Sequence, residues 1–74
     1  MSPRPPLLSG RDLVKTYENM GYRKVSQKGS HIKMKNNETG NVSIIPDHKE
    51  LDRWTLKSIL RHADISEEEL QKNI

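Results

Sequence analysis

The segment SHIKMK, residues 30–35, alternates polar and apolar side chains without interruption. A period of two residues predicts a β-strand with one buried face. Ile32 and Met34 are therefore expected in the core. The polar side chains of the same strand, those of His31, Lys33 and Lys35, are expected together on the opposite face.

Two further strands are predicted around this one. Residues 22–26 form the first, and a turn at residues 27–29 leads into the segment just described. Residues 36–41, Asn-Asn-Glu-Thr-Gly-Asn, have the composition of a tight turn. Residues 42–45 form the last strand, which ends at a proline. Three strands with such short links predict an antiparallel meander.

The segments before and after the three strands have apolar residues at helical spacing. The first helix is predicted over residues 10–20, with Ser9 and Asp12 forming a capping box and Gly21 ending the helix. A second is predicted over residues 54–63, where Trp54 is read as a core residue rather than a base-stacking platform. Tyr22 is left open between these same two roles.

A second capping box, which begins at Ser66, predicts a short C-terminal helix. The order of helix, three antiparallel strands, helix and short helix predicts a two-layer α+β fold. Both longer helices then cover one face of the sheet and leave the other face open. That open face is the one that carries His31.

Length and composition narrow the classes of protein. The 74 residues contain 31% apolar residues, which is enough for one small domain, predicted over residues 9–74, after an extended proline-rich segment at residues 1–8. A complete dinucleotide-binding domain or a barrel is excluded by size, and no small-molecule cofactor is predicted. The absence of cysteine excludes disulfides and thiolate metal sites. No apolar run is long enough for a membrane span, so a cytoplasmic protein is predicted.

Charge is unevenly distributed along the chain. The net charge is +3, but residues 11–35 hold seven lysines and arginines against two acidic residues. Residues 64–72 hold four acidic residues against one lysine. A basic face indicates a polyanionic partner such as nucleic acid, although an ordinary solvated surface is the alternative interpretation.

The three histidines, His31, His48 and His62, are the candidates for proton transfer. Only His31 lies on a predicted strand with its side chain toward the open face, where an imidazole can take or give a proton near neutral pH. His48 is predicted to fix its loop by hydrogen bonding, and His62 to complement the dipole of a helix end. A metal site built from His31, Asp47 and His48 is conceivable but not required by the spacing, and no metal is predicted.

The groups beside His31 suit a phosphate. Lysine charges can hold a phosphate and stabilise the extra charge of a pentacoordinate transition state. A glycine allows close approach of a ligand, and a serine supplies a hydroxyl donor. These neighbours are Lys28, Gly29, Ser30, Lys33 and Lys35. The alternative is that His31 is an ordinary polar residue on a solvated strand.

Several motifs resemble those of HicA toxins. Gly21-Tyr22 followed by Lys-Gly-Ser-His at residues 28–31 resembles the "GF…KGSH" run of that family. Residues 45–51 and 55–61 resemble its "vPxHkeL…gTLrsILr" segment, and the stretch from Ala63 resembles its ending. The resemblance covers about residues 9–70 in the family's order and spacing. Trp54 and Asp64 depart from it, because both stand where the family usually has glycine.

The resemblance implies a fold similar to a double-stranded-RNA-binding domain. It also implies the toxin of a toxin–antitoxin pair, an endoribonuclease that cleaves mRNA, with His31 at the position of the catalytic residue. The implied partner is a HicB-like antitoxin that covers the active face.

The mechanism that fits these residues is metal-independent cleavage, in which His31 activates a ribose 2′-hydroxyl and the neighbouring lysines bind phosphate. A non-catalytic RNA-binding module of the same fold is the competing prediction. A DNA-binding role ranks last, because no recognition helix with base-reading side chains is evident.

Overall fold

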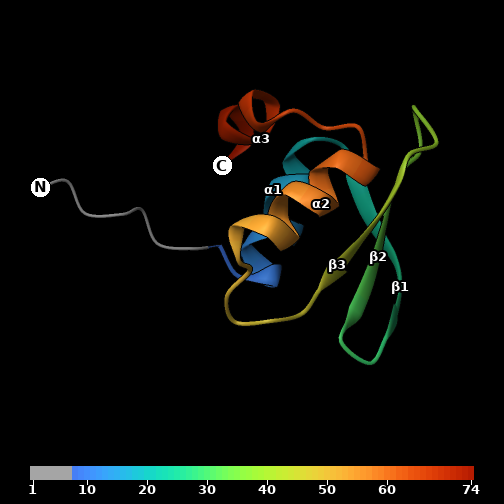
Figure 1. Cartoon of the computed structure of the whole chain (residues 1–74). Helices are drawn as coiled ribbons and strands as arrows, with labels where there is room; N and C mark the ends of the chain where they lie inside the picture. Colours follow the sequence, from blue (N-terminus) through green and yellow to red (C-terminus); the bar gives the residue numbers. More distant parts are fainter. Residues whose placement is uncertain (1–7) are drawn as a thin grey trace, which may run out of the picture.

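The computed structural model describes residues 8–74 (Figure 1). The extended segment predicted over residues 1–8 lies outside the described residues except for Leu8. The described elements are α1 (Gly10–Asn19), β1 (Tyr22–Lys28), β2 (His31–Asn36), β3 (Val42–Pro46), α2 (Arg53–His62) and α3 (Glu67–Asn73). Within this part of the chain, no helix combines the length and the apolar character that a membrane crossing needs.

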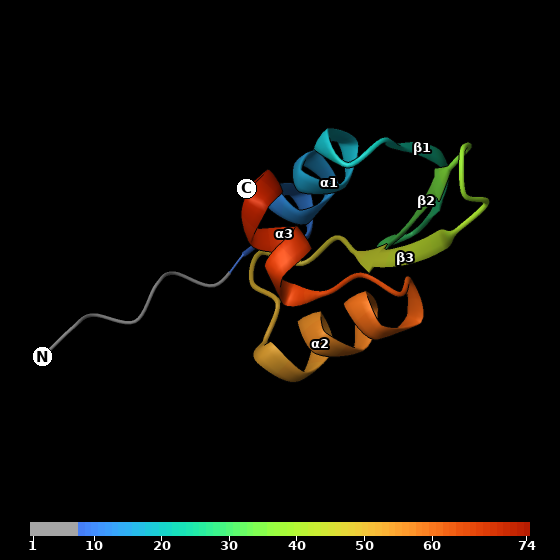
Figure 2. The same cartoon turned by 90° about the horizontal axis from the view of Figure 1, so that it is seen from above.

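The three strands form one antiparallel sheet in the order β1-β2-β3, so β2 is the central strand. All three helices lie on the same side of the sheet (Figure 2). α1 packs against β1 and β3, α2 packs against β3, and α3 packs against α1. The predicted two-layer α+β fold with one open sheet face is therefore confirmed.

The predicted alternation of buried and exposed side chains along β2 is also confirmed. Ile32 and Met34 are buried, whereas His31, Lys33 and Lys35 are exposed. The side chains that are almost wholly inaccessible come from both layers and from the link to α2. They are Leu13, Tyr17, Met34, Ile45 and Leu51.

The predicted capping box is complete at α1, whereas at α3 only its first half is present, the Ser66 hydroxyl accepting from the Glu69 amide at 3.0 Å. The Ser9 hydroxyl accepts from the Asp12 amide at 3.0 Å, and the Asp12 carboxylate accepts from the Ser9 amide at 3.2 Å. The hydrogen bond from the Ser9 amide lowers the pKa of Asp12. Gly21 ends this region with φ of +95°, a conformation that glycine adopts without strain.

β1 is longer than predicted, and a bulge explains the difference. The register with β2 shifts between Lys24 and Ser26, so Val25 has no direct partner. The extra residue lets pairing continue to Lys28, beyond the predicted end at residue 26. It also leaves the Val25 side chain exposed.

The prediction that Trp54 is a core residue is wrong, because its side chain is 82% exposed. The buried stripe of α2 runs through Ile59 and Leu60 to Ala63. At 100° per residue, Trp54 lies on nearly the opposite side of the helix from the centre of that stripe. Its position at the start of an apolar pattern was a misleading signal.

The way in which α2 ends determines the backbone conformation of Asp64. The Ile65 amide donates to the Leu60 carbonyl at 2.9 Å and the Asp64 amide to the Arg61 carbonyl at 3.2 Å, which is a Schellman motif. Asp64 adopts φ of +56° and is the sole non-glycine residue in residues 8–74 with positive φ. The motif requires this left-handed conformation, which glycine adopts most easily.

Tyr17 joins the helices to the sheet through a buried polar contact. Its hydroxyl lies 3.0 Å from the Ser43 hydroxyl of β3, and its ring meets the ring of Tyr22 edge-on at 4.7 Å between centroids. Tyr22 is only 5% exposed, so it is a core residue and not a stacking platform. Burial raises the pKa of Tyr17 to about 12, while the hydrogen bond with Ser43 opposes that rise.

The raised pKa of Tyr17 predicts that the free energy of unfolding falls at alkaline pH. Unfolding returns the Tyr17 pKa to its ordinary value near 10, so the folded state is favoured fully below pH 10 and loses that stability between about pH 10 and 12. We expect Tyr17→Phe to show a flatter decline of unfolding free energy over this range than the wild type, measured by urea titration. At pH 7 the variant should lose about 1–3 kcal/mol, because Ser43 loses its partner. Equal alkaline slopes for the two proteins would contradict this assignment.

Candidate functional site

The open face of the sheet carries three rows of directly paired residues. The row at one end contains Lys28, His31 and Pro46, with His31 in the middle. The next row contains Ser26, Lys33 and Ile44. The third contains Arg23, Lys35 and Val42.

Two columns of different chemistry follow from this register. The first is a basic column on β2, formed by His31, Lys33 and Lys35. Lys28 and Arg23 of β1 lie beside it. β3 presents exposed aliphatic side chains, of which Val42 is 39% and Ile44 is 46% exposed. The first column was predictable from the alternation in residues 30–35, whereas the second was not predicted, because three of the four residues in 42–45 are apolar and do not alternate clearly with polar ones.

The loop before His31 is short and internally braced. Lys28 pairs with His31, so Gly29 and Ser30 form a two-residue hairpin loop, and Gly29 has φ of +57°. Glycine with positive φ at the first loop position is the arrangement of a type II′ turn. No atom lies within 4 Å of the place where a Gly29 Cβ would stand, so the loop is open to a ligand.

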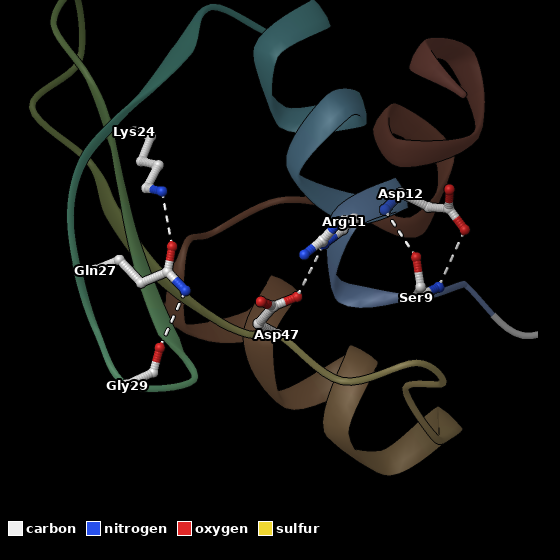
Figure 3. Close-up of polar contacts among 7 residues, drawn as sticks. All are labelled: Ser9, Arg11, Asp12, Lys24, Gln27, Gly29 and Asp47. Atoms are coloured by element: carbon white, nitrogen blue, oxygen red, sulfur yellow. Dashed lines mark hydrogen bonds and ion pairs between the residues drawn. The ribbon is translucent and has the colours of Figure 1, made fainter.

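Gln27 holds the same loop from β1. Its Nε2 donates to the Gly29 carbonyl at 3.0 Å, and its Oε1 accepts from Lys24 Nζ at 2.7 Å (Figure 3). This bracing fixes the backbone that leads directly into His31. The predicted site residues Lys28, Gly29 and Ser30 therefore lie together at one end of this hairpin.

A second brace comes from the loop after β3. The Asp47 amide donates to the Ser30 carbonyl at 2.6 Å, which extends the pairing of β3 beyond Pro46. The Asp47 carboxylate lies 3.5 Å from Arg11 Nε at the start of α1 (Figure 3). The sequence offered Asp47 only as a conceivable metal ligand, and its ion pair with Arg11 was not predicted, because that contact joins residues far apart in the sequence.

Gly10 allows α1 to approach this loop closely. Its amide donates to the His48 carbonyl at 2.8 Å, and a Cβ at this position would overlap the Pro46 carbonyl oxygen. The backbone carbonyl of His48, rather than its imidazole, thus fixes the loop. The His48 imidazole makes no hydrogen bond within residues 8–74.

Gly10→Ala is therefore expected to destabilise the protein by about 1–3 kcal/mol, because a backbone carbonyl cannot move aside as a side-chain tip can. The displaced loop should also lower any activity that depends on His31, since Asp47 pairs with Ser30. Chemical denaturation checks the first effect. Glu18→Ala, an exposed change in the same helix, is the control and should stay near wild type. Equal stability of the two variants would refute the close approach.

His62 and the candidate metal ligands lie apart from one another. His62 is exposed on α2, and its Nδ1 lies 2.7 Å from the Ser58 carbonyl, a contact within one helix. In the described part of the chain, no three His, Cys, Asp or Glu side chains gather as a metal would need. His31, Asp47 and His48 are therefore not brought together as a ligand set.

Comparison with known proteins identifies the family of the chain. Residues 10–65 match the model of a family described as HicA toxin of bacterial toxin-antitoxin. No match is found among curated proteins or among solved structures. The matched range runs from the first residue of α1 to the end of the Schellman motif, so it contains the whole sheet and the His31 site. The chain belongs to the HicA toxin family, and it is a toxin of a toxin–antitoxin system.

Proposed function

We propose that this toxin is an endoribonuclease that cleaves mRNA without a metal ion and that His31 is its catalytic residue. The observation that carries the proposal is the placement of His31 on the central strand of an open sheet face, directly opposite Lys28 and on the same face as Lys33. An imidazole among cations suits proton transfer next to a bound phosphate.

The chemistry needs one proton transfer and one substitution at phosphorus. His31 removes the proton of a ribose 2′-hydroxyl, and the resulting oxygen bonds to the adjacent phosphorus. The bond from phosphorus to the 5′-oxygen breaks, and the leaving oxygen takes up a proton. The products are a 2′,3′-cyclic phosphate and a 5′-hydroxyl. mRNA supplies such a substrate in the cytoplasm.

The remaining predicted site residues hold the substrate. Lys28 and Lys33 flank His31 on the open face, and Lys35 extends the same column by one row. Their charges attract consecutive phosphates and favour the charged transition state. The hairpin loop of Gly29 and Ser30 leaves room for the RNA backbone and offers the Ser30 hydroxyl as a donor.

The test uses a labelled single-stranded RNA in the presence of EDTA. We expect cleavage to persist in EDTA, to fail on the same sequence with 2′-deoxy sugars, and to leave cyclic phosphate ends. Cleavage of the 2′-deoxy strand would contradict attack by the 2′-hydroxyl. Loss of activity in EDTA that returns with added magnesium would contradict the metal-independent route.

A non-catalytic RNA-binding module is the second candidate, and the basic column on β2 is the observation that favours it. Such a module binds phosphates and 2′-hydroxyls without breaking a bond. It would retain RNA binding in the wild type with no cleavage under any of these conditions. Its affinity would fall with Lys33→Ala and barely change with His31→Ala.

We further propose that a HicB-like antitoxin covers the open face. RNA phosphates explain the basic column but not the aliphatic column of Val42 and Ile44. A protein partner with apolar side chains beside acidic ones would satisfy both columns. Ile44→Asp is expected to abolish co-purification of the co-expressed antitoxin, while Gln71→Asp on α3 is the control and should leave it intact. Co-purification of both variants would exclude this face as the docking surface.

A further inference from the structure

The exposed indole of Trp54 is not explained by the His31 site. It is 82% exposed and is the single tryptophan of the chain. A tryptophan gains by removal from water and is enriched at interfaces, so its surroundings on α2 decide whether this one serves a partner. α2 belongs to the helical layer on one side of the sheet (Figure 2). His31 is exposed on the other side, since it alternates with the buried Ile32 and Met34.

Trp54 stands at the head of a polar stripe along α2. Lys57, Ser58 and Arg61 follow it at three, four and seven residues, which places all four side chains on one side of the helix. These residues line a shallow groove of about 600 Å³. Leu60, Ile65 and Glu67 complete its lining.

The charge of this surface is basic. Arg53, Lys57 and Arg61 are exposed, and α2 contains no acidic residue. Within residues 8–74, none of these three cations takes part in an ion pair. Glu67 is the one acidic residue that lines the groove.

We propose that this groove binds a single strand of RNA at a site separate from His31, with a base stacked on the Trp54 indole. Lys57 and Arg61, which both follow Trp54 along α2, hold successive phosphates on one side of that base. Stacking accepts any base, because every base has a π face, and cations beside an aromatic ring are the usual means of tracking a strand. The proposal rests on RNA being the ligand of this toxin, and it adds a second contact that anchors the strand beyond the cleavage point.

A polyanion suits the groove better than a protein segment does. An acidic polypeptide would satisfy the lysine and arginine but has no group that requires a flat aromatic face. A single-stranded RNA supplies phosphates and stacking faces together at a regular spacing. The antitoxin already has a face of matching chemistry on the sheet, in the aliphatic column beside the basic one.

Tryptophan fluorescence tests the stacking directly, because all of the signal comes from Trp54. The protein carries His31→Ala so that the RNA stays intact, and its binding is followed in parallel by the anisotropy of a labelled oligouridylate. We expect oligouridylate to quench the emission along the same curve as the anisotropy. A ribose-phosphate oligomer of equal length without bases should bind without quenching.

Substitutions then measure what the indole contributes. Trp54→Ala should weaken RNA binding about fivefold or more, whereas Trp54→Phe should retain most of the affinity, since one stacked base is worth about 1 kcal/mol or more. Lys57→Ala should weaken binding and lower its dependence on salt.

Three results would overturn the proposal. They are saturated anisotropy without quenching, equal RNA affinity of Trp54→Ala and wild type, and quenching by the antitoxin but not by RNA. The last result would assign the groove to a protein. None of these measurements involves cleavage, so failure of the ribonuclease proposal and failure of this one give different results.

Discussion

His31→Ala is expected to slow RNA cleavage by roughly 10²–10⁴-fold, the contribution of one general base, while leaving RNA affinity nearly unchanged. The substitution removes the proton acceptor but keeps both flanking lysines and the backbone pairs of the central strand. An exposed side chain at this position contributes little to packing, so the thermal midpoint should stay near that of the wild type. Single-turnover cleavage of a labelled RNA gives the rate.

His62→Ala is the matched control for this experiment. It removes another exposed imidazole, but one that lies on α2 and contacts its own helix. Its rate should equal that of the wild type. If His31→Ala cleaves at the wild-type rate, the proton is taken by another group and the proposed role of His31 is excluded. If both variants slow equally, the loss reflects a general effect on the protein.

Ile45→Ala is expected to destabilise the protein by about 2–5 kcal/mol, because Ile45 is 0% exposed and its removal leaves a cavity between the sheet and the helices. A chain of 74 residues has a total unfolding free energy of roughly 4–11 kcal/mol, so this one change should remove much of it. Urea unfolding measures the loss. The variant should also accumulate poorly in cells when it is expressed alone.

Ile44→Ala is the control, and it differs from the test only by one position along β3. Ile44 is 46% exposed on the open face, so its truncation should cost well under 1 kcal/mol. Co-expression of an antitoxin should restore the level of Ile45→Ala, because a partner that binds only the folded state stabilises it by mass action. Similar stabilities of the two variants would show that the layers are not packed through Ile45.

The strand of residues 30–35 was predictable because its polar and apolar side chains alternate, so only one of its two faces can lie against the core. Ile32 and Met34 had to face the helices, and this same constraint put His31 and Lys33 on the open face. The caps at Ser9 and Ser66 were predictable for a similar reason, since the groups that cap a helix lie within three residues of each other. Local rules of this kind determined most of the fold and half of the candidate site.

The other half depended on contacts that no local rule contains. Arg11 meets Asp47 because Gly10 lets α1 touch the loop after β3, and the sequence carries no sign of that approach. Trp54 was misplaced for a different reason. Apolar character predicted burial, but the direction of its side chain is set by the helix phase, and Ile59 and Leu60 determine that phase.

The position of β2 between two partners has a consequence for how this toxin is silenced. Backbone hydrogen bonds on both sides hold the strand that carries His31, so its amide hydrogens should exchange with solvent about as slowly as global unfolding permits. Local opening of this strand should therefore cost nearly as much free energy as unfolding of the whole domain. If the proposed antitoxin covers the open face, we expect it to inhibit by occluding His31 rather than by rearranging the strand, so that inhibition follows the molar ratio of antitoxin to toxin.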